Sequence, residues 1–80
     1  MKVKYIGVSF YTDGLTDGKI YDVLDIEGPY LRVVDDSEED YLYDISNPGP
    51  LDMSGPGGEW EIIEDEEGRL QEAFDKFLGK

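Results

Sequence analysis

The stretch from Lys19 to Ile45, KIYDVLDIEGPYLRVVDDSEEDYLYDI, decides the fold of this chain. It holds three runs rich in β-branched and aromatic residues, at 19–26, 30–35 and 40–45. Two short turns separate these runs, Glu27-Gly28-Pro29 and Asp36-Ser37-Glu38, and both consist of residue types that reverse a chain. Apolar residues recur at alternate positions within the runs, which is the period of a strand. The pattern therefore predicts three consecutive antiparallel strands joined by tight turns.

Two further strands and one helix are predicted on either side of this stretch. Residues 2–10 are again β-branched and aromatic, and the apolar phase changes between Tyr5 and Ile6, which predicts a bulge or a strand buried on both faces. Residues 60–64 predict a fifth strand, with Trp60 facing the same side as Ile62. Residues 66–78 predict a helix, because one apolar stripe is formed by Leu70, Phe74, Phe77 and Leu78. Gly68 weakens the first turn, which allows the helix to start at about residue 69 instead.

The connections between these elements are marked by capping residues, proline and glycine. Asp65 is placed to cap the start of the helix, and Gly79 is placed to end it. Residues 46–58 hold three of the four prolines and four of the ten glycines, which predicts a loop. No crossover helices separate the strands, as a parallel sheet would require. The chain is therefore predicted to be one mainly β domain over residues 1–80, a small five-stranded barrel with one C-terminal α-helix.

Two segments within residues 15–45 resemble a known kind of barrel. The block LTDGKIYDVLDI, from Leu15 to Ile26, looks like the opening of an SH3-like barrel, where a Gly ends a long loop and a Tyr-x-Val-Leu strand follows. The block YLRVVDDSEEDYLY, from Tyr30 to Tyr43, is similar to the central hairpin of that barrel. Together they resemble small, mostly uncharacterised SH3-like barrel proteins of Gram-positive bacteria and their phages. The resemblance implies an SH3-like fold and names no activity.

All of the net charge of −13 lies in one stretch. From Asp35 to Glu67 there are 13 acidic residues and no basic one, while the rest of the chain nearly cancels. This asymmetry favours a positively charged partner. The same charge repels anionic lipid and phosphate backbones, so we expect no direct binding to nucleic acid and no binding to a membrane. The absence of cysteine is compatible with a reducing cytoplasm, where we expect the protein to be located.

The composition argues against catalysis. The chain has no histidine and no cysteine, so the commonest general base and the thiol nucleophile are missing. The segment Gly55-Pro56-Gly57-Gly58 lacks the Lys-Ser/Thr of a phosphate-binding loop. Acidic residues crowd two runs, at 35–40 and 64–67, and the first run lacks the spacing and the Gly of an EF-hand loop. We expect no enzyme activity, no cofactor and no metal site; the catalytic alternative is a hydrolase that uses carboxylates and a metal.

The sequence thus predicts a non-enzymatic, acidic interaction module that binds a basic protein or peptide. SH3-like domains take proline-rich basic peptides in tyrosine-rich grooves beside acidic loops. By analogy, a groove of this kind is expected to use aromatic and acidic residues, namely Tyr11, Tyr43 and Trp60 with Asp13, Asp17, Asp36 and Glu38. The alternative for the tyrosines is that their rings pack on the core with the hydroxyls in water.

Three other interpretations stay open at this point. Carboxylates on a rigid frame can imitate DNA phosphates, which would make the protein an inhibitor of a nucleic-acid-binding protein. The acids can also serve solubility alone, in a structural role without a dedicated ligand. The apolar stripe of the helix either closes an open end of the barrel or docks on another chain, so we expect a monomer or a weak homodimer.

Overall fold

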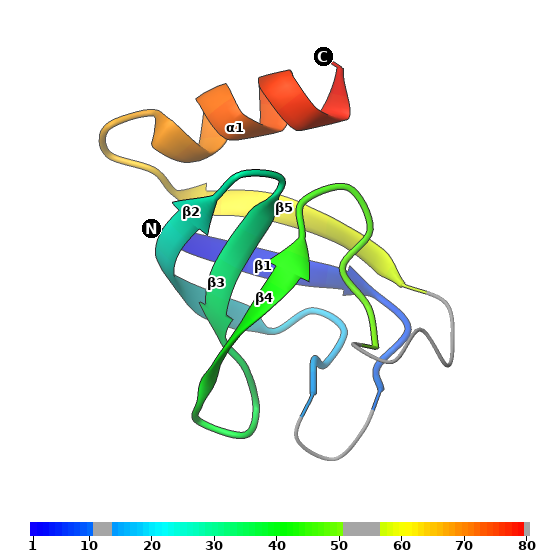
Figure 1. Cartoon of the computed structure of the whole chain (residues 1–80). Coiled ribbons are helices and arrows are strands. Elements are labelled where there is room, and N and C mark those ends of the chain that lie inside the picture. The colour runs from blue at the N-terminus through cyan, green and yellow to red at the C-terminus, as the bar shows by residue number, and fades with distance from the viewer. Residues whose placement is uncertain (11–13, 51–56, 80) are drawn as a thin grey trace.

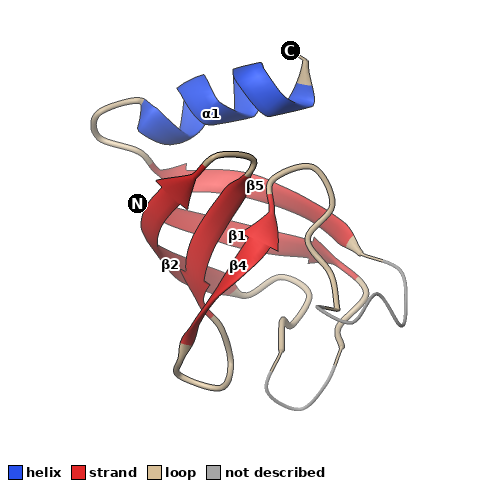
Figure 2. Ribbon diagram, viewed as in Figure 1, coloured by secondary structure: helices blue, strands red, loops and turns tan. Residues whose placement is uncertain are grey.

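The computed structural model describes residues 1–10, 14–50 and 57–79 (Figure 1). The elements are five strands and a helix: β1 (Lys2–Gly7), β2 (Ile20–Glu27), β3 (Tyr30–Val34), β4 (Asp40–Asp44), β5 (Gly58–Glu64) and α1 (Arg69–Leu78). All neighbouring strands are antiparallel, and their order in the sheet is β4-β3-β2-β1-β5. The prediction of a mainly β fold with five strands and one C-terminal helix is confirmed (Figure 2).

The sheet bends at β2, so that its two edge strands approach each other. The first part of β2 pairs with β1 and its second part with β3, with a register shift between Val23 and Asp25. At the edges, the indole Nε1 of Trp60 in β5 donates to the carbonyl of Asp44 in β4 at 3.0 Å. The described strands form no ladder between β4 and β5. Closure of the sheet into an SH3-like barrel therefore stays a prediction.

The first strand differs most from its prediction. The predicted span 2–10 is too long, because β1 ends at Gly7, where a Cβ atom would lie 2.6 Å from the Cα of Gly58. The predicted bulge between Tyr5 and Ile6 is wrong, since the register shift against β5 lies between Lys2 and Val3. Tyr5 is fully buried while Ile6 is 41% exposed. The apolar residues after Tyr5 therefore do not form a second buried face.

Side chains from one face of the sheet and from α1 form a single core. Trp60 lies at its centre and meets the rings of Tyr5, Tyr21 and Tyr43 edge-on, with centroids 5.7, 6.5 and 6.4 Å away. Large aromatic side chains supply the buried area that a domain of 80 residues otherwise lacks. The remaining buried apolar residues are Val3, Leu15, Val23, Leu31, Val33, Ile45, Leu70, Ala73 and Phe74.

The helix α1 lies across one end of the sheet and buries Leu70 and Phe74 there (Figure 1). It begins at Arg69, the later of the two predicted starts, because Gly68 occupies the N-cap position in a left-handed conformation with φ 72°. The predicted cap is confirmed: the carboxylate of Asp65 accepts hydrogen bonds from the backbone N–H groups of Leu70 and Gln71, at 3.0 and 2.9 Å. Within the described residues, no helix has the length and apolar character needed to span a membrane.

Candidate functional site

Two of the predicted site aromatics belong to the core. Tyr43 and Trp60 are only 2% and 7% exposed. The hydroxyl of Tyr43 donates to Oδ2 of Asp35 at 2.7 Å. The pKa of Tyr43 is raised, mainly by burial and secondly by this hydrogen bond. The ring of Tyr43 is thus enclosed by protein and does not line a surface groove. Two other predicted residues, Tyr11 and Asp13, lie outside the described part of the chain.

Asp36 connects the turn after β3 to the loop before β2. Its carboxylate accepts hydrogen bonds from the hydroxyl of Thr16 at 2.7 Å, the hydroxyl of Tyr21 at 3.1 Å and the ammonium of Lys19. Burial pushes the pKa of Asp36 upward, but these three donors together push it down further, so that the pKa lies below its ordinary value. With its side chain only 9% exposed, Asp36 serves this internal network instead of facing a partner.

The last two predicted acids, Asp17 and Glu38, are exposed residues of the loops at that same end of the sheet. Oδ1 of Asp17 accepts a hydrogen bond from the backbone N–H of Gly7 at 3.1 Å. Glu38 lies in the turn after β3 and has a positive φ of 68°. Neither acid is among the residues that line the groove containing Trp60. Among the described members of the predicted site, Asp17, Asp36 and Glu38 thus share one end of the sheet, while Tyr43 and Trp60 are buried in the core.

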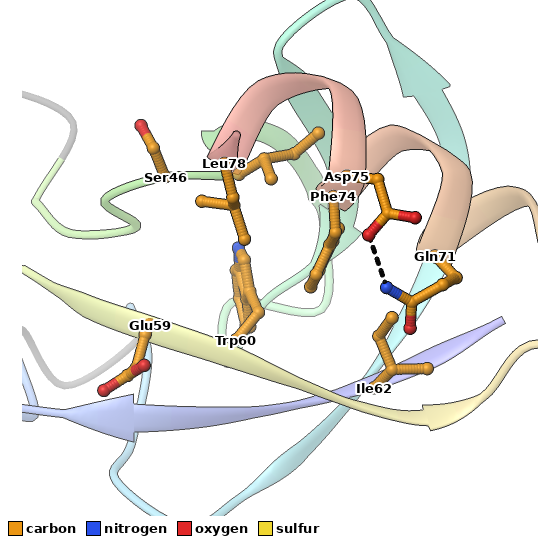
Figure 3. A pocket seen from close by; sticks show the side chains of 9 residues that line it. Ser46, Glu59, Trp60, Ile62, Gln71, Phe74, Asp75 and Leu78 are labelled. Atoms are coloured by element: carbon orange, nitrogen blue, oxygen red, sulfur yellow. Dashed lines mark hydrogen bonds between the residues drawn. The ribbon is translucent and has the colours of Figure 1, made fainter. Parts of the chain in front are cut away.

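The structure instead contains a groove of about 300 Å³ between α1 and β5, seen from close by in Figure 3. Apolar side chains line it from both elements. Trp60 and Ile62 point up from β5 and form the floor, while Phe74 and Leu78 point down from α1. Ile45 and Ser46, which follow β4, close one side. This volume lies at the lower end of those of ligand sites, so the groove suits side chains of a peptide better than a large cofactor.

The rim of this groove is acidic. Two exposed acids are among its lining residues, Asp75 on α1 and Glu59 on β5, and no basic residue is among the lining residues that the structure describes. Asp75 stands at the rim, whereas the side chain of Glu59 points from β5 away from the floor formed by Trp60 and Ile62 (Figure 3). Oδ1 of Asp75 accepts a hydrogen bond from the side chain of Gln71 at 2.8 Å, which orients the carboxylate at the rim (Figure 3). The groove can thus bind an apolar side chain that is flanked by positive charge.

The sequence contained a signal for this groove that the prediction did not use. The apolar stripe of the helix predicts either packing on the barrel or docking on another chain, and its members Leu70 and Phe74 are buried in the core. Leu78, on the last turn, is only half-buried and leaves space against β5. Asp75 follows Phe74 directly, which places an acid beside the stripe. What the sequence could not provide was the tertiary contact that brings β5 opposite this part of α1.

The opposite flank of α1 has a different charge. A second groove there, of about 280 Å³, is lined by Arg69 and Lys76 together with Glu72, and by the half-buried Phe77. The two flanks of one helix thus offer an acidic groove and a largely basic one. Phe77 and Leu78, adjacent in sequence but on different grooves, form a natural pair for comparing the two sides.

No group of three or more acidic, histidine or cysteine side chains is placed to hold a metal ion in the described part of the chain. Comparison with known proteins found no matching family model, no matching curated protein and no matching solved structure. The functional argument therefore rests on the groove and on the distribution of charge.

Proposed function

We propose that this protein is a non-enzymatic interaction module that binds a basic segment of a partner protein in the groove between α1 and β5. The observation that carries the proposal is the combination of an apolar floor with an acidic rim. Apolar contact supplies affinity, because it removes surface from water. The carboxylate of Asp75 at the rim, together with that of Glu59 on the outer face of β5, selects for lysine or arginine next to the apolar side chain.

The charge of the whole molecule supports the same kind of partner. A net charge of −13 on 80 residues creates a negative potential that accelerates encounters with a basic chain. This steering weakens as added salt shortens the Debye length. Association with the partner is therefore expected to slow at high ionic strength, while the apolar contacts in the groove persist.

A DNA mimic is supported less well. Such a protein needs its carboxylates to point outward in place of phosphates. Asp35 and Asp36 instead accept hydrogen bonds from the hydroxyls of core tyrosines, and Asp65 caps α1. These three acids of the stretch 35–67 are used for the fold itself, which favours a peptide in the groove over an array of phosphate substitutes.

The test is a selection of displayed random nonapeptides on the purified protein, followed by titration of synthetic copies with Trp60 fluorescence as the readout. Trp60 is the only tryptophan and lines the groove. We expect the selected peptides to carry lysine or arginine beside aliphatic or aromatic residues. Recovery of peptides without basic residues, or of none, would contradict the proposal. Selection of no peptide, together with capture of a nucleic-acid-binding protein that duplex DNA displaces, would favour the mimic.

Matched variants separate the groove from the bulk charge. The double variant Glu59→Gln/Asp75→Asn, called the rim variant, removes the charges of the two acids that line the groove, and Glu66→Gln/Glu67→Gln removes two exposed charges outside this groove. The rim variant is expected to weaken peptide binding about tenfold, which corresponds to about 1.4 kcal/mol, and the control less than about twofold. Equal weakening by the two variants would show that charge alone, and not the groove, binds the peptide.

A further inference from the structure

We infer that the bound segment is extended and joins β5 as a sixth strand, with basic and apolar side chains in alternation, at the edge that faces away from β1 over Trp60 and Ile62, beyond the position where Gly58 donates to Pro48. This inference rests on the proposed function and adds the conformation and the sequence pattern of the partner. It follows from three features of β5: the direction of its backbone groups, the position of α1 beside it, and the charges on its outer face.

The backbone N–H and C=O groups of Trp60 and Ile62 point away from β1. Tyr5 is the residue of β1 that lies opposite Trp60, and its backbone bonds to the segment before β2. Its N–H donates to the carbonyl of Lys19 at 3.0 Å, and its carbonyl accepts from the N–H of Gly18 at 2.7 Å. Tyr5 and Trp60 are therefore a pair without mutual backbone hydrogen bonds, and the groups of Trp60 point to the other side of β5. In an antiparallel ladder the direction of these groups alternates along the strand. The N–H of Gly58, two residues before Trp60, accordingly donates to Pro48 and not to β1.

The same two residues line the groove beneath α1. Trp60 and Ile62 place their side chains on its floor. The helix α1 runs in the opposite direction to β5 and lies across the groove from it (Figures 1 and 3). The groove therefore combines a strand edge, an apolar floor and a flanking helix. Recognition by strand addition uses these parts: the edge supplies main-chain hydrogen bonds, and pockets for alternate side chains supply specificity.

Charges on β5 determine which segment fits this edge. Glu59 and Glu61 are exposed on the face of β5 opposite to Trp60, and a strand added at the edge would place alternate side chains beside them. Opposite charges across neighbouring strands stabilise a pair, and like charges oppose it. The side chains in between would point to the floor formed by Trp60 and Ile62. The expected occupant is thus a segment of a basic protein in which lysine or arginine alternates with aliphatic residues.

This pattern also keeps the edge from pairing with a second copy of the chain. Along β5 the outward face carries Glu59 and Glu61, so two copies of β5 side by side would oppose carboxylate to carboxylate. Charged residues on edge strands are a known means of avoiding such self-association. The edge is thereby reserved for a chain of opposite charge.

The test compares two nonapeptides of equal composition, one with arginine and valine in strict alternation and one with the arginines and valines in separate blocks. The alternating peptide is expected to bind about tenfold more tightly than the block peptide. N-methylation of alternate residues in one phase should lower its affinity by a further factor of about ten, whereas methylation in the other phase should change it less than about twofold. Amide hydrogen exchange of Trp60 and Ile62 should slow in the complex.

The outcomes separate this inference from the proposed function. If the two peptides bind with equal affinity, and Glu59→Gln/Asp75→Asn weakens both, the proposal of a binding module stands and strand addition is overturned. Equal sensitivity to both methylation phases would overturn it as well, because a strand on an edge uses one phase only. Absence of binding by either peptide and by every selected peptide would overturn both proposals.

Discussion

Replacing Tyr43 by phenylalanine removes one hydroxyl group from the core and is expected to destabilise the protein by about 2 kcal/mol. This hydroxyl donates to Oδ2 of Asp35 at 2.7 Å, and Asp35 is only 6% exposed. The other carboxylate oxygen, Oδ1, accepts from the backbone N–H and the hydroxyl of Ser37. The substitution therefore leaves one oxygen of a buried carboxylate without its donor while the aromatic ring stays in place.

The magnitude follows from the charge and the burial of the acceptor. A hydrogen bond to a charged group contributes about 1.5–3 kcal/mol, and the unpaired carboxylate keeps its desolvation penalty. Tyr41→Phe is the matched control, because Tyr41 also lies in β4 and its hydroxyl donates to a carboxylate oxygen of Glu39 at 3.0 Å. Tyr41 is 39% exposed, so its loss is expected to stay below about 0.5 kcal/mol.

Urea unfolding followed by Trp60 fluorescence measures both variants. With a denaturant slope of about 1 kcal/mol per molar, a loss of about 2 kcal/mol lowers the midpoint by about 2 M at unchanged slope. A Tyr43→Phe midpoint within about 0.5 M of the parent protein, or equal shifts in the two variants, would refute the reasoning that Asp35 depends on this hydroxyl.

Three further predictions concern the acidic residues. The pKa of Asp36 is lowered in the folded protein, so its carboxylate adds stability above the unfolded pKa of about 4. This stability is lost as the pH falls through the pKa of the folded state. Asp36→Asn should therefore flatten the acid limb of a plot of urea midpoint against pH. Glu38→Gly should raise the stability by about 0.5–1 kcal/mol, because glycine adopts a positive φ without strain, and a decrease in the melting midpoint would contradict this. Asp65→Ala should lower the stability by about 1 kcal/mol through loss of the cap, whereas Glu66→Ala should change it by less than about 0.5 kcal/mol, both measured by urea unfolding.

The strands of the central stretch could be predicted from sequence because local signals agree there. The predicted spans 19–26, 30–35 and 40–45 lie within one residue of β2, β3 and β4 at each end. Polar turns separate these runs, and the buried positions Tyr21, Val23, Leu31 and Val33 alternate with more exposed neighbours. Turn chemistry and side-chain period thus specify the same register.

Other parts of the fold depend on contacts that no local pattern encodes. Ile6 and Val8 continue an apolar alternation, yet they are 41% and 54% exposed, because this small domain covers only one face of β1. The end of β1 is determined by the close approach of Gly7 to Gly58, which are far apart in the sequence.

The candidate site was the least predictable part. Sequence alone showed a surplus of carboxylates and tyrosines but not which of them would meet. Tyr21 and Tyr43 donate hydrogen bonds to Asp36 and Asp35 across the strands, which uses two of the predicted site residues, Tyr43 and Asp36, within the fold. The groove exists only because α1 folds back over β5, so its position follows from tertiary packing.

The most direct test of the central claim locates a basic peptide on the protein by amide NMR. The probe is the alternating arginine–valine nonapeptide, titrated into isotopically labelled protein. Binding in the groove is predicted to shift the amide signals of Trp60 and Ile62 in β5 and of residues 74–78 along α1, and to leave the turn at 36–38 unchanged. Shifts confined to that turn, or spread evenly over the acidic stretch 35–67, would contradict a binding site between α1 and β5.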